Sequence, residues 1–239
     1  MADDRYCLTR QLAEIRNRIL VVVLVWAAAA AAAFVFADLL LKHLLLAGPQ
    51  VPVVYITPPE LFLVKLRLAL VAGLVVCLPL LVLQVLLFLF PALYARERRR
   101  TAFFLLMTLV FAAAGALFAY RIALPALFGF FAAFDHAQID AVFDLQQYVG
   151  FIANTTVVIA LGFESPLVIW FLGVSGIVSK ERLRAIRAYV YLALLLLAAI
   201  LTPADPISML LVALPLALLY EVGVVLVALT NGAGTPARE

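Results

Sequence analysis

The membrane topology of this chain is decided at the segment Phe90-Pro91-Ala92-Leu93-Tyr94-Ala95-Arg96-Glu97-Arg98-Arg99-Arg100. The segment holds one carboxylate among four arginines, and a hydrophobic stretch of membrane length ends directly before it. Cytoplasmic loops of membrane proteins carry an excess of Lys and Arg, so this segment indicates which side of a bilayer it faces. It also places a single acid, Glu97, where an extended cationic peptide can reach it.

The composition assigns the chain to integral membrane proteins. Of its 239 residues, 67% are hydrophobic and 13% are charged, and the mean hydropathy is +1.18. Soluble domains of this length do not carry so much apolar surface. No polar stretch is long enough to fold separately, so residues 1–239 are predicted to form a single membrane domain.

Six apolar stretches are candidates for membrane-spanning helices, which need about 20 residues each. Their unbroken apolar character excludes the alternating pattern of an outer-membrane β-barrel. The sequence therefore predicts an all-α membrane protein with six transmembrane helices, and an even number of spans places both termini on one side. The predicted spans are residues 19–37, 63–89, 102–124, 149–172, 188–202 and 207–229, followed by a tail at 230–239.

The Lys and Arg residues are shared very unequally between the two sides of this topology. Of the 17 in the chain, those on the side of the termini lie in the N-terminal segment, the 90–100 loop, the 173–187 loop and the tail. The other side retains Lys42, Lys65, Arg67 and Arg121. This bias predicts that both termini are cytoplasmic. It also explains the pI of about 9.0, so the basic charge does not indicate a nucleic-acid partner.

The last two predicted spans are joined by a link too brief to travel far, Thr202-Pro203-Ala204-Asp205-Pro206. The stretch from Arg187 to Pro203 rises only about 22 Å as a helix, which is short of the roughly 30 Å hydrocarbon core. We therefore expect this end of the protein to thin the bilayer locally or to submerge the link.

Two acids fall inside predicted spans. Glu164 precedes Pro166, which is expected to kink the fourth span. An ionisable group at this depth either is bonded internally or faces a cavity, where a passing substrate or partner helix can bind it, and the sequence leaves both alternatives open. Glu221 lies about two turns before the cytoplasmic end of the sixth span, which favours a structural role.

The motifs argue against an enzyme. Gly173-Val174-Ser175-Gly176 resembles the serine motif of rhomboid proteases, but the two histidines, His43 and His136, fall in predicted outer loops and cannot activate Ser175. We interpret the motif as a turn after a helix. Cys7 and Cys77 have no metal-ligand spacing, and no phosphate-binding loop is present, so no metal, nucleotide or other cofactor is predicted.

The segment before the first span is predicted to be an amphipathic helix, because Leu12, Ile15 and Ile19 recur at helical spacing. Glu14 in this segment and Glu97 are the prominent acids of a strongly basic surface, and both lie at the membrane boundary. Two carboxylates can hold two guanidinium groups by charge-assisted hydrogen bonds.

The chain resembles the TatC family, the core receptor subunit of the twin-arginine protein translocase, over essentially its whole length. The segment 90–99 resembles the family's first cytoplasmic loop and is the most specific match. The other matching elements, in order, are Leu12-Ala13-Glu14-Ile15-Arg16, Thr57-Pro58-Pro59-Glu60, Phe163-Glu164-Ser165-Pro166, Leu201-Thr202-Pro203-Ala204-Asp205 and Tyr220-Glu221-Val222-Gly223.

The resemblance implies a curved, glove-like bundle with short fifth and sixth helices in a bacterial or archaeal cytoplasmic membrane. It implies that folded cargo crosses at the expense of the proton-motive force, in an oligomeric complex with the single-span subunits TatA and TatB. The paired arginines of a signal peptide would bind Glu14 and Glu97, in a site shaped by Arg16, Phe90 and Arg98. Glu164 would lie on the concave face. Pro91, Pro166 and Glu221 would be structural.

By the same resemblance, the partner helices would contact the chain around Thr202 and Asp205. Gln11 stands where the family often has His, so no proton role is expected for that position. Met209 stands where some relatives have a polar residue facing the partner helix, so partner contact here is expected to rely more on Thr202 and Ser208. The alternative function is a small-solute transporter or channel. That alternative needs its critical polar groups across the membrane midplane, whereas the informative acids of this chain lie at the cytoplasmic edge.

Overall fold

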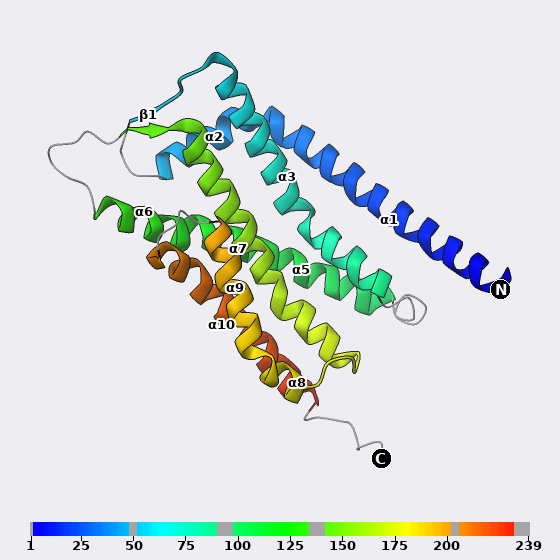
Figure 1. Ribbon diagram of the computed structural model, residues 1–239. Coiled ribbons are helices and arrows are strands. Elements are labelled where there is room, and N and C mark those ends of the chain that lie inside the picture. The colour runs from blue at the N-terminus through cyan, green and yellow to red at the C-terminus, as the bar shows by residue number, and fades with distance from the viewer. Residues whose placement is uncertain (1, 48–51, 90–97, 134–141, 202–205, 232–239) are drawn as a thin grey trace.

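The computed structural model describes residues 2–47, 52–89, 98–133, 142–201 and 206–231, and nearly all of them are helical (Figure 1). The long helices are α1 (Ala2–Val35), α3 (Pro58–Leu89), α5 (Arg98–Phe118), α7 (Leu145–Val174), α9 (Arg187–Leu201) and α10 (Pro206–Asn231). The short elements are α2 (Ala37–Ala47), β1 (Val53–Val54), the π-helical turn η1 (Ala119–Ala123), α6 (Leu124–Ala132), β2 (Phe143–Asp144) and α8 (Lys180–Ala185).

Among the described residues, five helical segments are long and apolar enough to cross a membrane: Ile15–Val35, Pro58–Leu86, Phe103–Phe131, Leu145–Val174 and Pro206–Thr230. A shorter apolar helix covers Arg187–Ile200. All six predicted spans are thus apolar helices. The fifth is short as predicted, because α9 has 15 residues. The short sixth helix implied by the resemblance is wrong: α10 has 26 residues, about 39 Å at ~1.5 Å per residue, because the apolar helix runs uninterrupted through Pro215 from Pro206 to Asn231.

The third predicted span, residues 102–124, is too short. Phe103–Phe131 forms one helical segment that passes from α5 through η1 into α6. Pro125 occupies the first turn of α6, directly after the π-helical turn. Proline lacks an N–H group and clashes with the carbonyl one turn earlier, so it normally ends a helix. The widened turn before Pro125 lets the chain remain helical.

The helix α7 lies at the centre of the bundle and packs against α3, α5 and α10, while α1 packs mainly on α3 (Figure 1). The start of α1, the end of α3, the start of α5, α8 and the end of α10 lie toward one end of the molecule. The elements α2, β1, β2 and α6 lie toward the other end. There, β1 and β2 form a two-residue parallel ladder that the all-α prediction did not include.

The turn interpretation of residues 173–176 is confirmed. The helix α7 ends at Val174, and Gly176 has a φ of +75°, a left-handed conformation that glycine adopts without a steric penalty. The backbone N–H of Gly176 donates to the carbonyl of Gly173, and that of Ile177 donates to Leu172.

Candidate functional site

Hydrogen bonds join α1 and α3 at successive levels along their length. Near one end, Arg18 Nη1 donates to Gln84 Oε1 at 3.1 Å. Further along, Trp26 Nε1 donates to the carbonyl of Leu70 at 3.0 Å. At Gly73 the backbones are so close that an added Cβ would lie 2.6 Å from the Ala30 nitrogen. Small residues permit such close approach between membrane helices, so the alanine run of α1 and Gly73 together fix the crossing point.

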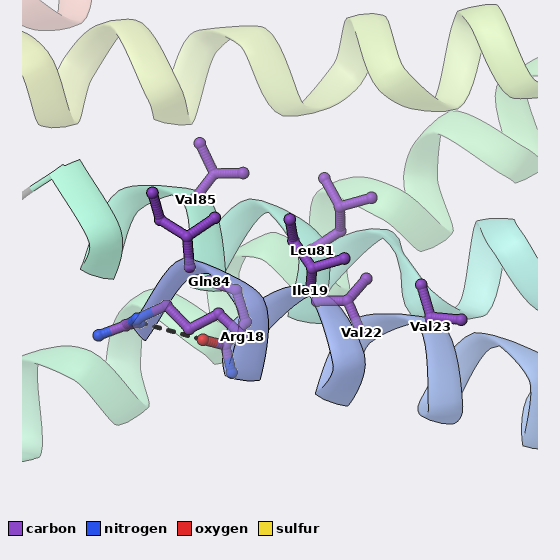
Figure 2. A pocket seen from close by; sticks show the side chains of 8 residues that line it. Arg18, Ile19, Val22, Val23, Leu81, Gln84 and Val85 are labelled. Carbon is purple, nitrogen blue, oxygen red and sulfur yellow. Dashed lines mark hydrogen bonds between the residues drawn. The ribbon is translucent and has the colours of Figure 1, made fainter. Parts of the chain in front are cut away.

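A groove of about 400 Å³ opens between these two helices at the Arg18 end (Figure 2). Its wall is apolar except for Arg18 and Gln84, whose hydrogen bond lies at its edge. The groove is lined by Ile15, Arg18, Ile19, Val22, Val23, Leu81, Gln84 and Val85, and we call it the α1–α3 groove.

The predicted signal-peptide site lies next to this groove in the sequence. Glu14 belongs to α1, one helical turn before Arg18, and Arg16 is exposed between them. The side chains of Glu14 and Arg98 lie outside the described part of the structure, as do Phe90, Pro91 and Glu97 entirely. What the structure shows is that the Arg18–Gln84 bond brings this part of α1 against the last turns of α3, shortly before Phe90.

Glu164 lies inside the bundle with 2% of its surface exposed. One turn before it, Ala160 packs in a cluster with Leu78 of α3 and Ala112 of α5. Three residues after it, Leu167 packs in a second cluster that includes residues of the same two helices. Neither carboxylate oxygen has a hydrogen-bond partner among the described residues. The structure thus buries Glu164 where α3, α5 and α7 meet, and these three helices screen its carboxyl group from solvent.

Pro166 lies inside α7 without ending the helix. The carbonyl of Gly162 would ordinarily accept from the N–H of residue 166, which proline lacks. The Ser165 hydroxyl replaces that donor and lies 2.6 Å from the Gly162 oxygen. The predicted structural role of Pro166 therefore has a local basis, and Ser165 compensates for the lost hydrogen bond.

The predicted partner-contact residues are divided. Thr202 and Asp205 lie outside the described residues. Ser208 has no exposed surface, so a partner helix reaches it only if α10 moves. Met209 is half-buried and packs against a cluster that includes Leu127 and Val212, which leaves part of its surface available.

Glu221 ties α10 to α9, in agreement with its predicted structural role. Its two oxygens accept hydrogen bonds from Arg187 Nη2 and from the Tyr191 hydroxyl, each at 2.5 Å. The neighbouring Tyr220 hydroxyl donates to the carbonyl of Leu183 in α8 at 2.7 Å. These three bonds fix the connection between α7 and α9 against α10.

Two of the polar contacts between helices that the sequence interpretation missed involve a side-chain amide. Besides Arg18 and Gln84, Arg67 Nη2 of α3 donates to Asn154 Oδ1 of α7 at 3.1 Å. In each pair, one residue is an amide within an otherwise apolar span. This interruption is the sequence signal from which the contact could have been predicted. Polar side chains inside membrane bundles commonly hydrogen-bond across helices. Among the described residues, no group of three or more His, Cys, Asp or Glu side chains is arranged to hold a metal ion.

The family model described as "Sec-independent protein translocase protein (TatC)" matches residues 10–215. The TatC protein of Aquifex aeolicus is 30% identical over 225 residues, which cover 92% of this chain and 93% of that protein. The TatC protein of Deinococcus radiodurans is 34% identical over 224 residues, which cover 90% of this chain and 83% of that protein.

Among solved structures, a crystal structure of the twin-arginine translocase receptor TatC superimposes with a TM-score of 0.83 at 29% identity, over 92% of this chain and 99% of that one. Sequence family, fold and the arrangement of apolar helices agree. The chain is a multi-pass membrane protein that belongs to the TatC family of Sec-independent protein translocase components.

Proposed function

We propose that this chain is the signal-peptide receptor of a twin-arginine translocase and that Glu14 and Glu97 bind the paired arginines of the peptide. The observation that carries the proposal is the Arg18–Gln84 bond. It holds the part of α1 that contains Glu14 against the end of α3, from which the chain continues to Glu97. The part of α1 that contains Glu14 and the end of α3 thereby lie against each other.

The charges around this site support selective binding of two guanidinium groups. Glu14 and Glu97 are flanked by Arg16, Arg96 and Arg98 in sequence. A weakly cationic peptide is repelled by these arginines, whereas two guanidinium groups that each pair with a carboxylate gain charge-assisted, bidentate hydrogen bonds. Arg16, Phe90 and Arg98 would shape the site, and Pro91 would direct the chain out of α3.

The proposal includes the topology and the partners. Six helices would cross the cytoplasmic membrane with both termini in the cytoplasm, in a curved, glove-like bundle. TatA and TatB would bind near Thr202, Asp205 and Met209, where the short α9 meets α10, and the proton-motive force would drive folded cargo across. The buried carboxyl of Glu164 would become accessible to a partner helix when α3, α5 and α7 separate.

Binding of a twin-arginine peptide to the purified, detergent-solubilised protein tests the central claim. Glu14→Gln and Glu97→Gln should each weaken binding about 10- to 100-fold, since a hydrogen bond to a charged group contributes about 1.5–3 kcal/mol. Glu97→Arg should be worse, because it adds like-charge repulsion to the lost acceptor. The matched control is Glu181→Gln, which removes an exposed acid from α8 at the same end of the molecule.

The same experiment separates the proposal from its alternative. A peptide with two lysines in place of the arginines measures the bidentate contribution and should bind more weakly to the unaltered protein. Equal capture of the twin-arginine peptide by the unaltered protein and by the Glu14→Gln, Glu97→Gln double variant would refute the assignment. A solute transporter would then be the better hypothesis, and solute uptake into proteoliposomes would test it.

A further inference from the structure

We propose that the α1–α3 groove binds an anionic phospholipid, with the phosphate at Arg18 and Gln84 and one acyl chain along the apolar wall. The groove has a volume of about 400 Å³, within the ~300–1,000 Å³ range of small-ligand sites. Its lining is almost wholly apolar and consists of six aliphatic side chains together with the carbon atoms of Arg18 and Gln84, whose polar ends bond to each other at the edge of the groove. That combination matches a lipid, which has an apolar chain and an anionic headgroup.

The groove opens toward the bilayer. The segment Ile15–Val35 is a candidate membrane span, and only 6% of its most apolar window is buried inside the protein. On the α1 side of the groove, Ile19 and Val23 remain about half exposed, at 56% and 46%. Inside the hydrocarbon core, half-exposed side chains such as these contact lipid acyl chains. A groove between two tightly crossing helices therefore admits a chain from the bilayer.

Arg18 is near the N-terminal end of the candidate span, where its side chain would reach the lipid phosphates. It is the last charged residue of α1 before the apolar run that continues to Val35. Arginine side chains at the ends of membrane helices extend toward the headgroups, and basic pockets between such helices bind anionic headgroups. The guanidinium matches phosphate geometry, and its five N–H donors allow it to bind several acceptors at once.

Gln84 orients this cation. Its Oε1 accepts from Arg18 Nη1 at 3.1 Å and holds the guanidinium at the edge of the groove (Figure 2). The amide nitrogen of the same side chain is a donor that a phosphate oxygen can accept. Arg16 adds a further positive charge nearby and is exposed. The site should therefore prefer phosphatidylglycerol to phosphatidylcholine.

The test uses one of the two tryptophans as a reporter. Trp26 lies one turn after Val23 on α1, and a Trp170→Phe background leaves it as the single tryptophan. This protein is reconstituted in vesicles that contain phosphatidylglycerol or phosphatidylcholine with brominated acyl chains, which quench nearby indoles. Quenching of Trp26 should reach half of its maximum at a severalfold lower mole fraction of the brominated phosphatidylglycerol. Arg18→Gln should abolish this difference, and Arg18→Lys, which keeps the charge, should retain part of it.

Matched controls identify the groove as the site. Val23→Phe narrows the groove and should reduce quenching by the anionic lipid, whereas Leu24→Phe, at an exposed position outside the lining, should not. Arg184→Gln removes an exposed arginine of α8 and should leave the preference unchanged.

Equal quenching by the two lipids in the unaltered protein would overturn the proposal. So would an unchanged preference in Arg18→Gln, or an unchanged response in Val23→Phe. Loss of the preference on addition of millimolar inorganic phosphate would indicate a site for free anions and would also overturn it. The proposal does not depend on signal-peptide recognition, so the lipid preference should persist in the Glu14→Gln, Glu97→Gln double variant.

Discussion

The crossing of α1 and α3 predicts that Gly73→Ala loosens α1 from the bundle. An added Cβ would lie 2.6 Å from the nitrogen and 2.7 Å from the Cα of Ala30. These atoms are backbone, so no side-chain rotation can relieve the clash. To bring the nearest contact to 3.4 Å, where ordinary van der Waals contact begins, α1 must move away by about 0.8 Å. A gap of ~0.5–1 Å forfeits a quarter to a half of the dispersion energy of each contact.

The steric cost should be about 1–3 kcal/mol, the usual range for overpacking. Dispersion energy decides how firmly α1 packs on α3, because in lipid the hydrophobic effect does not drive two apolar helices to associate. Alanine also favours a helix over glycine by ~1 kcal/mol, and this gain has to be separated from the steric cost. Gly129→Ala provides the reference, since Gly129 is helical and has no heavy atom within 4 Å of an added Cβ.

The measurement is the free energy of unfolding of the purified protein in a denaturing-detergent titration, together with Trp26 emission in the Trp170→Phe background. Gly73→Ala should be less stable than Gly129→Ala by about 1–3 kcal/mol. Its Trp26 emission should shift, because displacement of α1 breaks the 3.0 Å bond from the indole to Leu70. If the two alanine variants are equally stable and Trp26 emission is unchanged, the backbone contact does not fix α1.

Two further predictions concern the glutamates of α7 and α10. Glu164→Leu should raise the free energy of unfolding by about 1–3 kcal/mol, because both carboxylate oxygens are buried without a partner among the described residues. A lower stability in the same titration would mean that the carboxyl is bonded. Glu221→Gln should lower stability by about 1–3 kcal/mol, since it weakens the bonds to Arg187 and Tyr191. A double-mutant cycle with Arg187→Met should give a coupling above about 0.5 kcal/mol, and additive effects would contradict the pairing.

The positions of the helices could be predicted because uninterrupted apolar length is a strong signal. The main error, at the third span, arose from Pro125. Sequence alone identifies a proline that should stop a helix, but not the π-helical turn that accommodates it. The sixth helix was expected to be short from the family resemblance, whereas the apolar stretch at 207–229 already indicated nearly the full length of α10. The ladder of β1 and β2 joins segments far apart in sequence, each only two residues long. Strands this short leave no periodic signal.

In the candidate site too, features that depend on neighbours in sequence could be predicted, whereas contacts between distant segments could not. Glu14 and Glu97 could be proposed as a site from their neighbours in sequence, since each is an acid within a basic segment at a membrane boundary, and their role stays a prediction. The pairing of Arg18 with Gln84 could not, because it depends on how α1 crosses α3. The sequence predicts that Glu164 lies within the bundle, and the structure buries it there. Its enclosure by α3, α5 and α7 became visible only when three helices could be placed together.

The uninterrupted length of α1 has a mechanical consequence. The helix has 34 residues, about 51 Å at ~1.5 Å per residue, and no proline interrupts it. The tight contact at Ala30 divides it into a long arm of about 42 Å toward the N-terminus and a short arm of about 8 Å toward α2. If α1 tilts about this pivot, a displacement at the N-terminal end reaches the α2 end reduced about fivefold. The helix is thus a lever with unequal arms. Such a tilt would turn a large displacement of the N-terminal end into a small one at the α2 end.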